Sequence, residues 1–99
     1  MSEVDDLFKR LQSYKGVIGG FIMNCDGIAI RTTLDNQTTS HWCYHVLRLI
    51  SKARVTVRDL DPQNDVTIMR LRTHRHEIII APDKDYMMVV IQEPRIEPI

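Results

Sequence analysis

The sequence predicts a mixed α/β protein of the α+β class, in which two helices pack on a five-stranded antiparallel sheet. Apolar residues recur at steps of three and four in two segments, which is typical of amphipathic helices. Five short apolar runs are bounded by Gly, Pro, Asn and Asp, which is typical of strands joined by turns. The predicted order is α-β-β-α-β-β-β, and the long second helix makes the one crossover between the two groups of strands.

The length of the chain allows one compact domain with a single core. The chain has 99 residues, of which 43 % are hydrophobic, so a packed interior is expected and disorder is not. We expect a single domain over 1–99, with its core at 2–92 and a short C-terminal tail at 93–99.

The first helix and a hairpin are expected in the first third of the chain. The apolar face of this helix consists of Val4, Leu7, Phe8 and Leu11. The helix should end near Gly16, because glycine adopts a left-handed cap conformation without strain. Two apolar runs, 17–24 and 28–33, then flank Asp26-Gly27. That dipeptide tolerates positive φ at both turn positions and predicts a tight hairpin.

A long amphipathic helix is expected in the middle of the chain. The side chains that can cap it are Asp35, Asn36, Thr38 and Thr39. Its apolar positions are Trp42, Val46, Leu49, Ile50, Ala53, Val57 and Leu60. This spacing predicts about five turns, roughly 20 residues. The opposite face carries His41, His45, Arg48 and Lys52 and should face water or a partner.

The stretch RDLDPQND at 58–65 is expected to end the long helix. Pro62 disfavours the helical conformation at the preceding aspartate, and Asp-Pro-x-Asn suits a tight turn. Three further strands are predicted at 65–72, 77–81 and 86–92.

The aspartates of 58–65 do not fit a calcium loop. Such a loop needs glycine at position 6 and a bidentate glutamate at position 12. Counted from Asp59, these positions hold Asn64 and Arg70, and a cation at the second one repels the ion. We therefore interpret the stretch as a corner of the chain.

His41 and His45 stand one helical turn apart, as the histidines of zinc proteases do. Those enzymes need glutamate directly after the first histidine, whereas Trp42 occupies that position here. A third ligand is also missing nearby, so the sequence predicts no metal site and no cofactor.

Catalytic and nucleic-acid-binding functions are not expected. The sequence has no phosphate-cradling glycine pattern, and neither Cys25 nor Cys43 has an evident base beside it, so both are interpreted as free thiols. Thirteen basic residues balance thirteen acidic ones, and no aromatic residues interleave with the arginines as stacking on bases requires. No apolar run approaches the length of a membrane-spanning helix, so we expect no membrane insertion.

The strand predicted at 65–72 has the pattern of a sheet edge. Val66 and Ile68 share a face with two arginines, while Met69 lies on the other face. Edge strands with this much apolar content tend to be paired or covered. Self-association through this strand is therefore expected.

Four segments resemble the roadblock family of cytoplasmic and axonemal dynein light chains. They are KRLQSYKGV (9–17), NCDGIAIRTTLDN (24–36), KARVTVRDLDPQND (52–65) and APDKDY (81–86). The resemblance runs from about Ser2 to Gln92 and implies a roadblock/profilin-like fold. Three features depart from the family: Ala29 stands where proline is usual, the tail EPRIEPI is atypical, and the start of the long helix is bulkier than usual at His41, Trp42, Tyr44 and His45.

The resemblance implies a non-catalytic homodimer, or a heterodimer with another roadblock light chain. The third strands would pair into one continuous sheet and the long helices would meet side by side. Such a dimer binds a short segment of the dynein intermediate chain and supports motor assembly and cargo attachment, in the cytoplasm and on microtubules. A platform for a small GTPase or its regulators is the alternative function. The expected interface residues are Trp42, Val46, Ile50, Ala53, Val66, Ile68, Met69 and Arg70.

Overall fold

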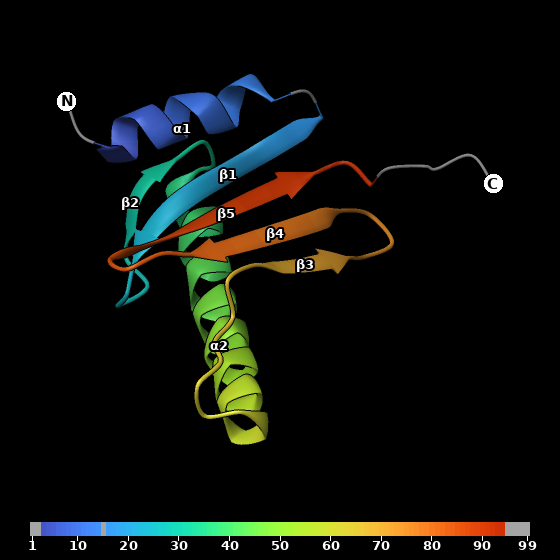
Figure 1. Ribbon diagram of the computed structural model, residues 1–99. Helices are drawn as coiled ribbons and strands as arrows, with labels where there is room; N and C mark the ends of the chain where they lie inside the picture. Colours follow the sequence, from blue (N-terminus) through green and yellow to red (C-terminus); the bar gives the residue numbers. More distant parts are fainter. Residues whose placement is uncertain (1–2, 15, 95–99) are drawn as a thin grey trace.

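Seven elements make up the part of the protein that the computed structural model describes, residues 3–14 and 16–94 (Figure 1). They are α1 (Glu3–Ser13), β1 (Val17–Asn24), β2 (Ala29–Thr32), α2 (Asn36–Leu60), β3 (Met69–Arg72), β4 (Glu77–Pro82) and β5 (Tyr86–Gln92). The strands form one sheet in the order β2-β1-β5-β4-β3, with every neighbouring pair antiparallel. The predicted fold class and order of elements are confirmed.

The two helices lie on opposite faces of the sheet. Strand alternation directs Phe21 and its partner Val89 to one face, where they form a buried core with Val46 and Ile50 of α2. The neighbouring pair Ile22 and Met88 points to the other face, beside the buried Val4 of α1. The side chains of Leu7 and Leu11, predicted to complete the apolar face of α1, lie outside the described residues, as do residues 95–99 of the predicted tail.

The hairpin between β1 and β2 is wider than the two-residue turn predicted. Gly16 and Gly27 adopt positive φ, 87° and 81°, but Asp26 does not. The Gly27 N–H donates to the Asn24 carbonyl (3.0 Å), and the Asn24 side-chain oxygen accepts from the N–H groups of Asp26 (2.9 Å) and Ile28 (3.0 Å). The Asn24 amide thus organises a longer loop in which one positive φ is sufficient.

Helix α2 has 25 residues and is longer than the five turns predicted. The apolar stripe begins at Trp42, but the helix begins at the Asp35 cap, whose carboxylate accepts from the Thr38 N–H at 2.7 Å. It ends at Leu60, and Asp61 is extended (φ −149°) before Pro62, as predicted for a residue that precedes proline. The C-terminal half of α2 extends beyond the β3 edge of the sheet (Figure 1).

Strand β3 has four residues, so the prediction of a strand over 65–72 is wrong for its first half. Residues 65–68 form no strand, because the Asp65 side chain accepts hydrogen bonds from Arg54 and Arg58 of α2 and from the N–H of Val66. These contacts hold the segment against the helix until the chain reaches Met69.

Replacing Gly27 with alanine should destabilise the fold more than replacing Gly16. Positive φ costs a residue with a Cβ about 1–2 kcal/mol at either position. At Gly27 the new Cβ also comes within 3.0 Å of the Leu47 Cδ2, whereas at Gly16 it meets nothing described within 4 Å. Urea unfolding of both variants measures the difference, and equal losses would show that Leu47 moves aside without cost.

Candidate functional site

One edge of the sheet is open along β3. This strand pairs with β4 on one side, and no strand of the described chain pairs with its other side. Leu71 lies on the α2 face of this edge and is 41 % exposed, and Ile68, just before the strand, is 55 % exposed. An unpaired backbone edge with apolar neighbours is a template for a further strand.

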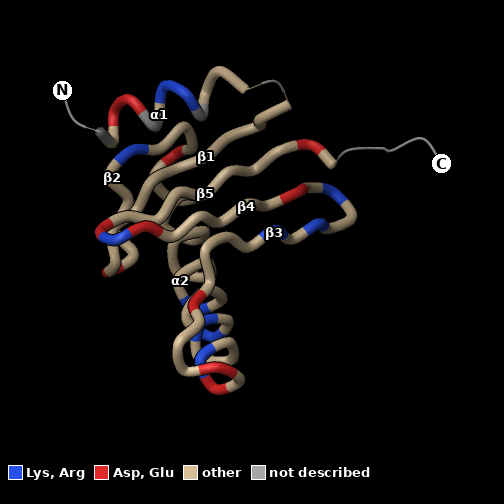
Figure 2. Tube along the Cα trace, viewed as in Figure 1, with Lys and Arg blue, Asp and Glu red and all other residues tan. Residues whose placement is uncertain are grey.

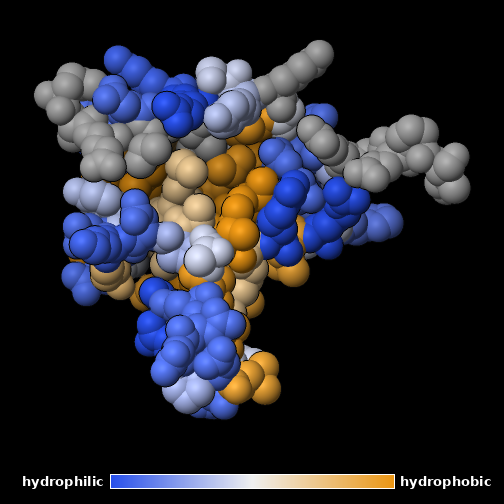
Figure 3. All heavy atoms as spheres, viewed as in Figure 1, coloured by the Kyte–Doolittle hydropathy of each residue, from blue (hydrophilic) through white to orange (hydrophobic). Residues whose placement is uncertain are grey.

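The projecting half of α2 places an apolar flank beside this edge. Steps of seven and four residues put Leu49, Ala53 and Leu60 on the same flank of the helix as Trp42. Leu60 is 83 % exposed and Leu49 is 39 % exposed, although both belong to the apolar stripe. Apolar side chains also appear at the surface of the projecting part in Figure 3. We define Leu49, Ala53, Leu60, Ile68 and Leu71 as the edge surface.

The structure separates the eight residues expected at the interface into three groups. Val46 and Ile50 are buried in the core of the chain itself. Trp42, Val66 and Met69 are partly buried against the same core. Ile68 and Arg70 are exposed at the sheet edge, and Ala53 is half-buried on the helix flank.

Sequence reasoning missed three residues of the edge surface: Leu49, Leu60 and Leu71. The first two were visible as members of the apolar stripe, and Leu71 as the next residue on the face of Met69. Which part of the stripe is exposed depends on where the sheet ends, and the helical spacing does not contain that information.

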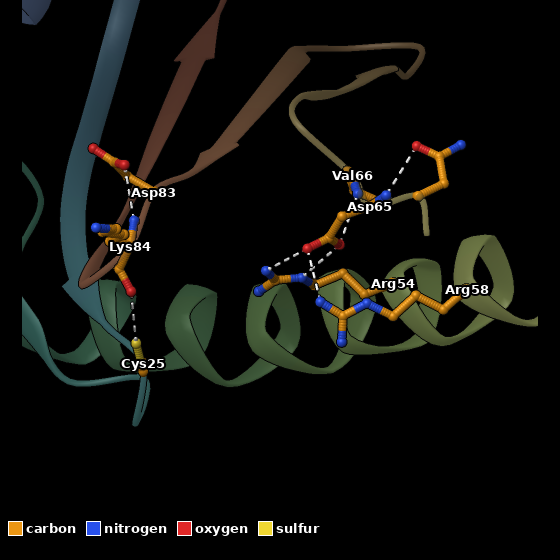
Figure 4. A network of polar contacts seen from close by, with 8 residues as sticks. Cys25, Arg54, Arg58, Asp65, Val66, Asp83 and Lys84 are labelled. Atoms are coloured by element: carbon orange, nitrogen blue, oxygen red, sulfur yellow. Dashed lines mark hydrogen bonds and ion pairs between the residues drawn. The ribbon is translucent and has the colours of Figure 1, made fainter. Parts of the chain in front are cut away.

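Asp65 fixes the point at which the chain enters β3 (Figure 4). Its carboxylate accepts from Arg54 Nε (3.1 Å) and Nη2 (3.0 Å), from Arg58 Nη2 (2.8 Å) and from the Val66 N–H (2.8 Å). These bonds, with that from Arg54 the largest, hold the pKa of Asp65 well below its usual range. We call this group the Asp65 clamp.

A cavity of about 420 Å³ lies beside the Asp65 clamp. Cys25, Ser51 and Lys84 are among its lining residues. The Cys25 thiol lies 3.8 Å from the Lys84 carbonyl oxygen and 3.7 Å from that of Asp85, so its described contacts are acceptors rather than a base. This arrangement offers no activated nucleophile.

Glu77 organises the opposite face of the same edge. It is buried, and its carboxylate accepts from Gln92 Nε2 (2.6 Å), Arg70 Nη2 (3.0 Å) and Arg72 Nη2 (3.2 Å). The hydrogen bond from Gln92 and then those from the two arginines lower its pKa. Both guanidinium groups are therefore held in place on the surface.

The two histidines of α2 are in contact with each other and with a tyrosine. The rings of His41 and His45 meet edge to face with centroids 4.7 Å apart, and Tyr44 meets His45 at 5.1 Å. The Arg48 guanidinium lies 5.4 Å from the centre of the Tyr44 ring. Within the described residues, no three His, Cys, Asp or Glu side chains converge on a common metal position.

Comparison with known proteins decides the family. The family model for the Roadblock/LC7 domain matches residues 3–93. The chain belongs to the Roadblock/LC7 family. This confirms the resemblance to roadblock proteins. None of the described helices of this family member is long and apolar enough to span a bilayer.

Solved structures with this fold include bacterial proteins. A Roadblock/LC7 domain from Streptomyces avermitilis is 18 % identical, with a TM-score of 0.81 over 93 % of this chain and 79 % of that one. MglB from Myxococcus xanthus is 14 % identical, with a TM-score of 0.78 over 98 % and 80 %. The gliding protein MglB from Thermus thermophilus is 7 % identical, with a TM-score of 0.75 over 91 % and 70 %. At these identities the similarity concerns the fold alone.

Replacing Asp65 with asparagine should remove a contribution to stability that depends on pH. Because the folded-state pKa of Asp65 is lowered, its contribution is full above about pH 4, the ordinary pKa of an aspartate, and is lost as pH falls further. Asp65→Asn should therefore be less stable than the wild type at pH 7, and the gap should shrink in acid. Urea unfolding at several pH values measures both.

Asp59→Asn is the matched control, because Asp59 is an exposed aspartate of the same helix end. Its stability should follow that of the wild type across the pH range. A gap for Asp65→Asn that stays constant down to pH 2 would contradict the clamp.

Proposed function

We propose that the protein is a non-catalytic adaptor that acts as a homodimer, with the two β3 strands paired antiparallel across a two-fold axis. The observation that carries this proposal is the open β3 edge beside the apolar flank of α2. In such a dimer the projecting half of each α2 extends under the sheet of its partner. Leu49, Leu60 and Leu71 would then leave water, and each fully buried leucine contributes about 2 kcal/mol.

An adaptor role agrees with the chemistry of the described residues. Three described carboxylates have a lowered pKa, and all are engaged by the fold itself: Asp65 and Glu77 by arginines, and Asp35 by the N–H of Thr38 at the start of α2. The thiol of Cys43 is buried and burial raises its pKa, which opposes reactivity. The described residues therefore provide exposed surfaces for a partner and no activated group for catalysis.

The first candidate partner is a small GTPase or one of its regulators. The fold similarity to bacterial Roadblock/LC7 and MglB proteins supports a platform role that does not depend on a dynein motor. The exposed cluster of His41, Tyr44, His45 and Arg48 on α2 supplies aromatic and arginine side chains, which are enriched at protein interfaces.

The dynein intermediate chain is the second candidate partner. The segments 52–65 and 81–86, which carry the resemblance to dynein light chains, support it. However, Arg54, Arg58 and Asp65 of this motif form the Asp65 clamp, and Pro62 forms the corner. Much of the motif is thus explained by the fold, which is why this candidate comes second.

Placing glutamate at Leu71 should abolish the dimer. Antiparallel pairing across a two-fold axis brings each residue of β3 close to its counterpart or a near neighbour. Two like charges in a partly desolvated seam cost several kcal/mol. Sedimentation at micromolar concentration should give about twice 11.6 kDa for the wild type and the monomer mass for Leu71→Glu and Ile68→Glu.

Ser40→Glu is the control for the dimer, because Ser40 is exposed near the start of α2, away from the edge surface. This variant should sediment as the wild type does. A wild type that sediments as a monomer would contradict the proposed dimer.

Replacing Tyr44 with alanine should weaken binding of a small GTPase about tenfold, since an aromatic anchor contributes on the order of 1–2 kcal/mol at an interface. The GTPases that co-purify with the protein from cytosol would be expressed and titrated by calorimetry, with Gln63→Ala as the control. If no GTPase binds and an intermediate-chain segment does, the second candidate replaces the first.

A further inference from the structure

We propose that His41 and His45 of α2 form a two-ligand site for a divalent transition-metal ion of the class that imidazole binds, such as Zn²⁺. One ring nitrogen from each histidine would bind the ion, and water fills its remaining positions in the isolated protein. The prediction of no metal site was based on the absence of a third ligand, whereas this site needs only two ligands from the chain. The inference goes beyond the adaptor function proposed above and does not depend on it.

The two rings already meet at about the distance that binding of one ion requires. The centroids of His41 and His45 are 4.7 Å apart, with an angle of 79° between the ring planes. Zinc binds imidazole nitrogen at about 2.0–2.1 Å, so two rings that share one ion at a tetrahedral angle have centres about 5 Å apart. The last torsion of a histidine side chain is broad, so ring rotation can direct both nitrogens at one position.

Neither ring is engaged by another polar group of the protein. Among the residues that the structure describes, no hydrogen bond or ion pair involves a ring nitrogen of His41 or His45. Their described ring contacts are with each other and with Tyr44, and both histidines are exposed. The neutral form of imidazole has one nitrogen with a free lone pair, and a metal ion needs that lone pair as its ligand.

Helix α2 holds the pair in place before any ion binds. Residues four positions apart lie one above the other on the same face of a helix. Cys43 and Val46 of the same turns are buried against the sheet, so the backbone that carries the histidines is already ordered. Once one imidazole binds an ion, the second binds it within the same molecule, which strengthens the complex.

The charge around the pair sets the expected affinity. Residues 36–47 of α2 contain no charged side chain, and the basic residues of this helix begin at Arg48 (Figure 2). The Arg48 guanidinium lies 5.4 Å from the centre of the Tyr44 ring, one turn beyond His45, and its charge opposes that of the ion. The rings also lack the carboxylate that often supports a metal-binding histidine, which is worth about 10–100-fold in affinity. We therefore expect a dissociation constant on the order of 10 µM.

The site should distinguish metal ions by their preferred ligands. Imidazole nitrogen suits Zn²⁺, Ni²⁺ and Cu²⁺, whereas Mg²⁺ and Ca²⁺ prefer oxygen. Calorimetric titration of Zn²⁺ into the full-length protein should show one ion per chain, and Mg²⁺ should show no binding. In NMR spectra the side-chain nitrogen signals of His41 and His45 should move with Zn²⁺, while those of His74 and His76 stay in place.

Substitutions test whether the spacing of the pair creates the site. His41→Ala and His45→Ala should each weaken Zn²⁺ binding at least tenfold, because a single imidazole remains. The matched control is His74→Ala, which removes an exposed histidine from the β3–β4 turn, and Cys25→Ser removes the exposed thiol. Both should bind Zn²⁺ as the wild type does. Adding Gln37→His to His45→Ala places a new histidine four positions before His41, at an exposed site, and should restore most of the affinity.

Four results would overturn the metal site. The first is a wild type that binds no Zn²⁺ below millimolar concentration, and the second is an unchanged affinity of His41→Ala or His45→Ala. Loss of binding in Cys25→Ser would show that the thiol holds the ion. A ratio of one ion to two chains would show that two copies share each ion, which contradicts a site within one chain. Recovery of binding by Gln37→His supports the site, and failure of that variant to recover it while the helix content is unchanged contradicts it.

Discussion

The Asp65 clamp is the constraint on which the candidate surfaces depend. By binding Arg54 and Arg58 of α2, the carboxylate keeps residues 65–68 beside the helix and delays the start of β3 to Met69. The edge strand is therefore short, and the chain between Asp65 and Ile68 occupies one flank of α2. The other flank, with Leu49 and Leu60, is left uncovered. A longer β3 would have drawn this loop into the sheet and changed which apolar residues remain exposed.

Local signals in the sequence predicted the elements that local contacts determine. The Asp35 cap, the positive φ of Gly16 and the extended residue before Pro62 all follow from neighbours within a few positions. The predictions of a two-residue turn and of a strand over 65–68 were wrong because a side chain in each segment makes a hydrogen bond that the local pattern does not indicate. The Asn24 amide reshaped the Asp26-Gly27 turn, and Asp65 was bound by an arginine eleven positions away, which no strand pattern encodes.

The candidate site could be predicted only in part for a related reason. Helical spacing identified the apolar stripe of α2, but Val46 and Ile50 are buried against the sheet, whereas Leu49 and Leu60 are exposed. Leu49 is exposed because it lies on the flank of the helix beside the buried Ile50, and Leu60 because the helix extends past the sheet, and both depend on how the whole fold places α2.

The alternation of β3 gives the two faces of the open edge different chemistry. Leu71 points to the face of α2, while Arg70 and Arg72 on either side of it point to the face of α1 and reach Glu77. In the proposed dimer, pairing of two β3 strands brings four such arginines together near the two-fold axis. The four guanidinium groups would repel one another there, and the two Glu77 carboxylates that they bind would offset part of that repulsion. The clamp and the corner are accounted for by contacts within this chain, whereas the identity of the partner depends on the exposed residues around them.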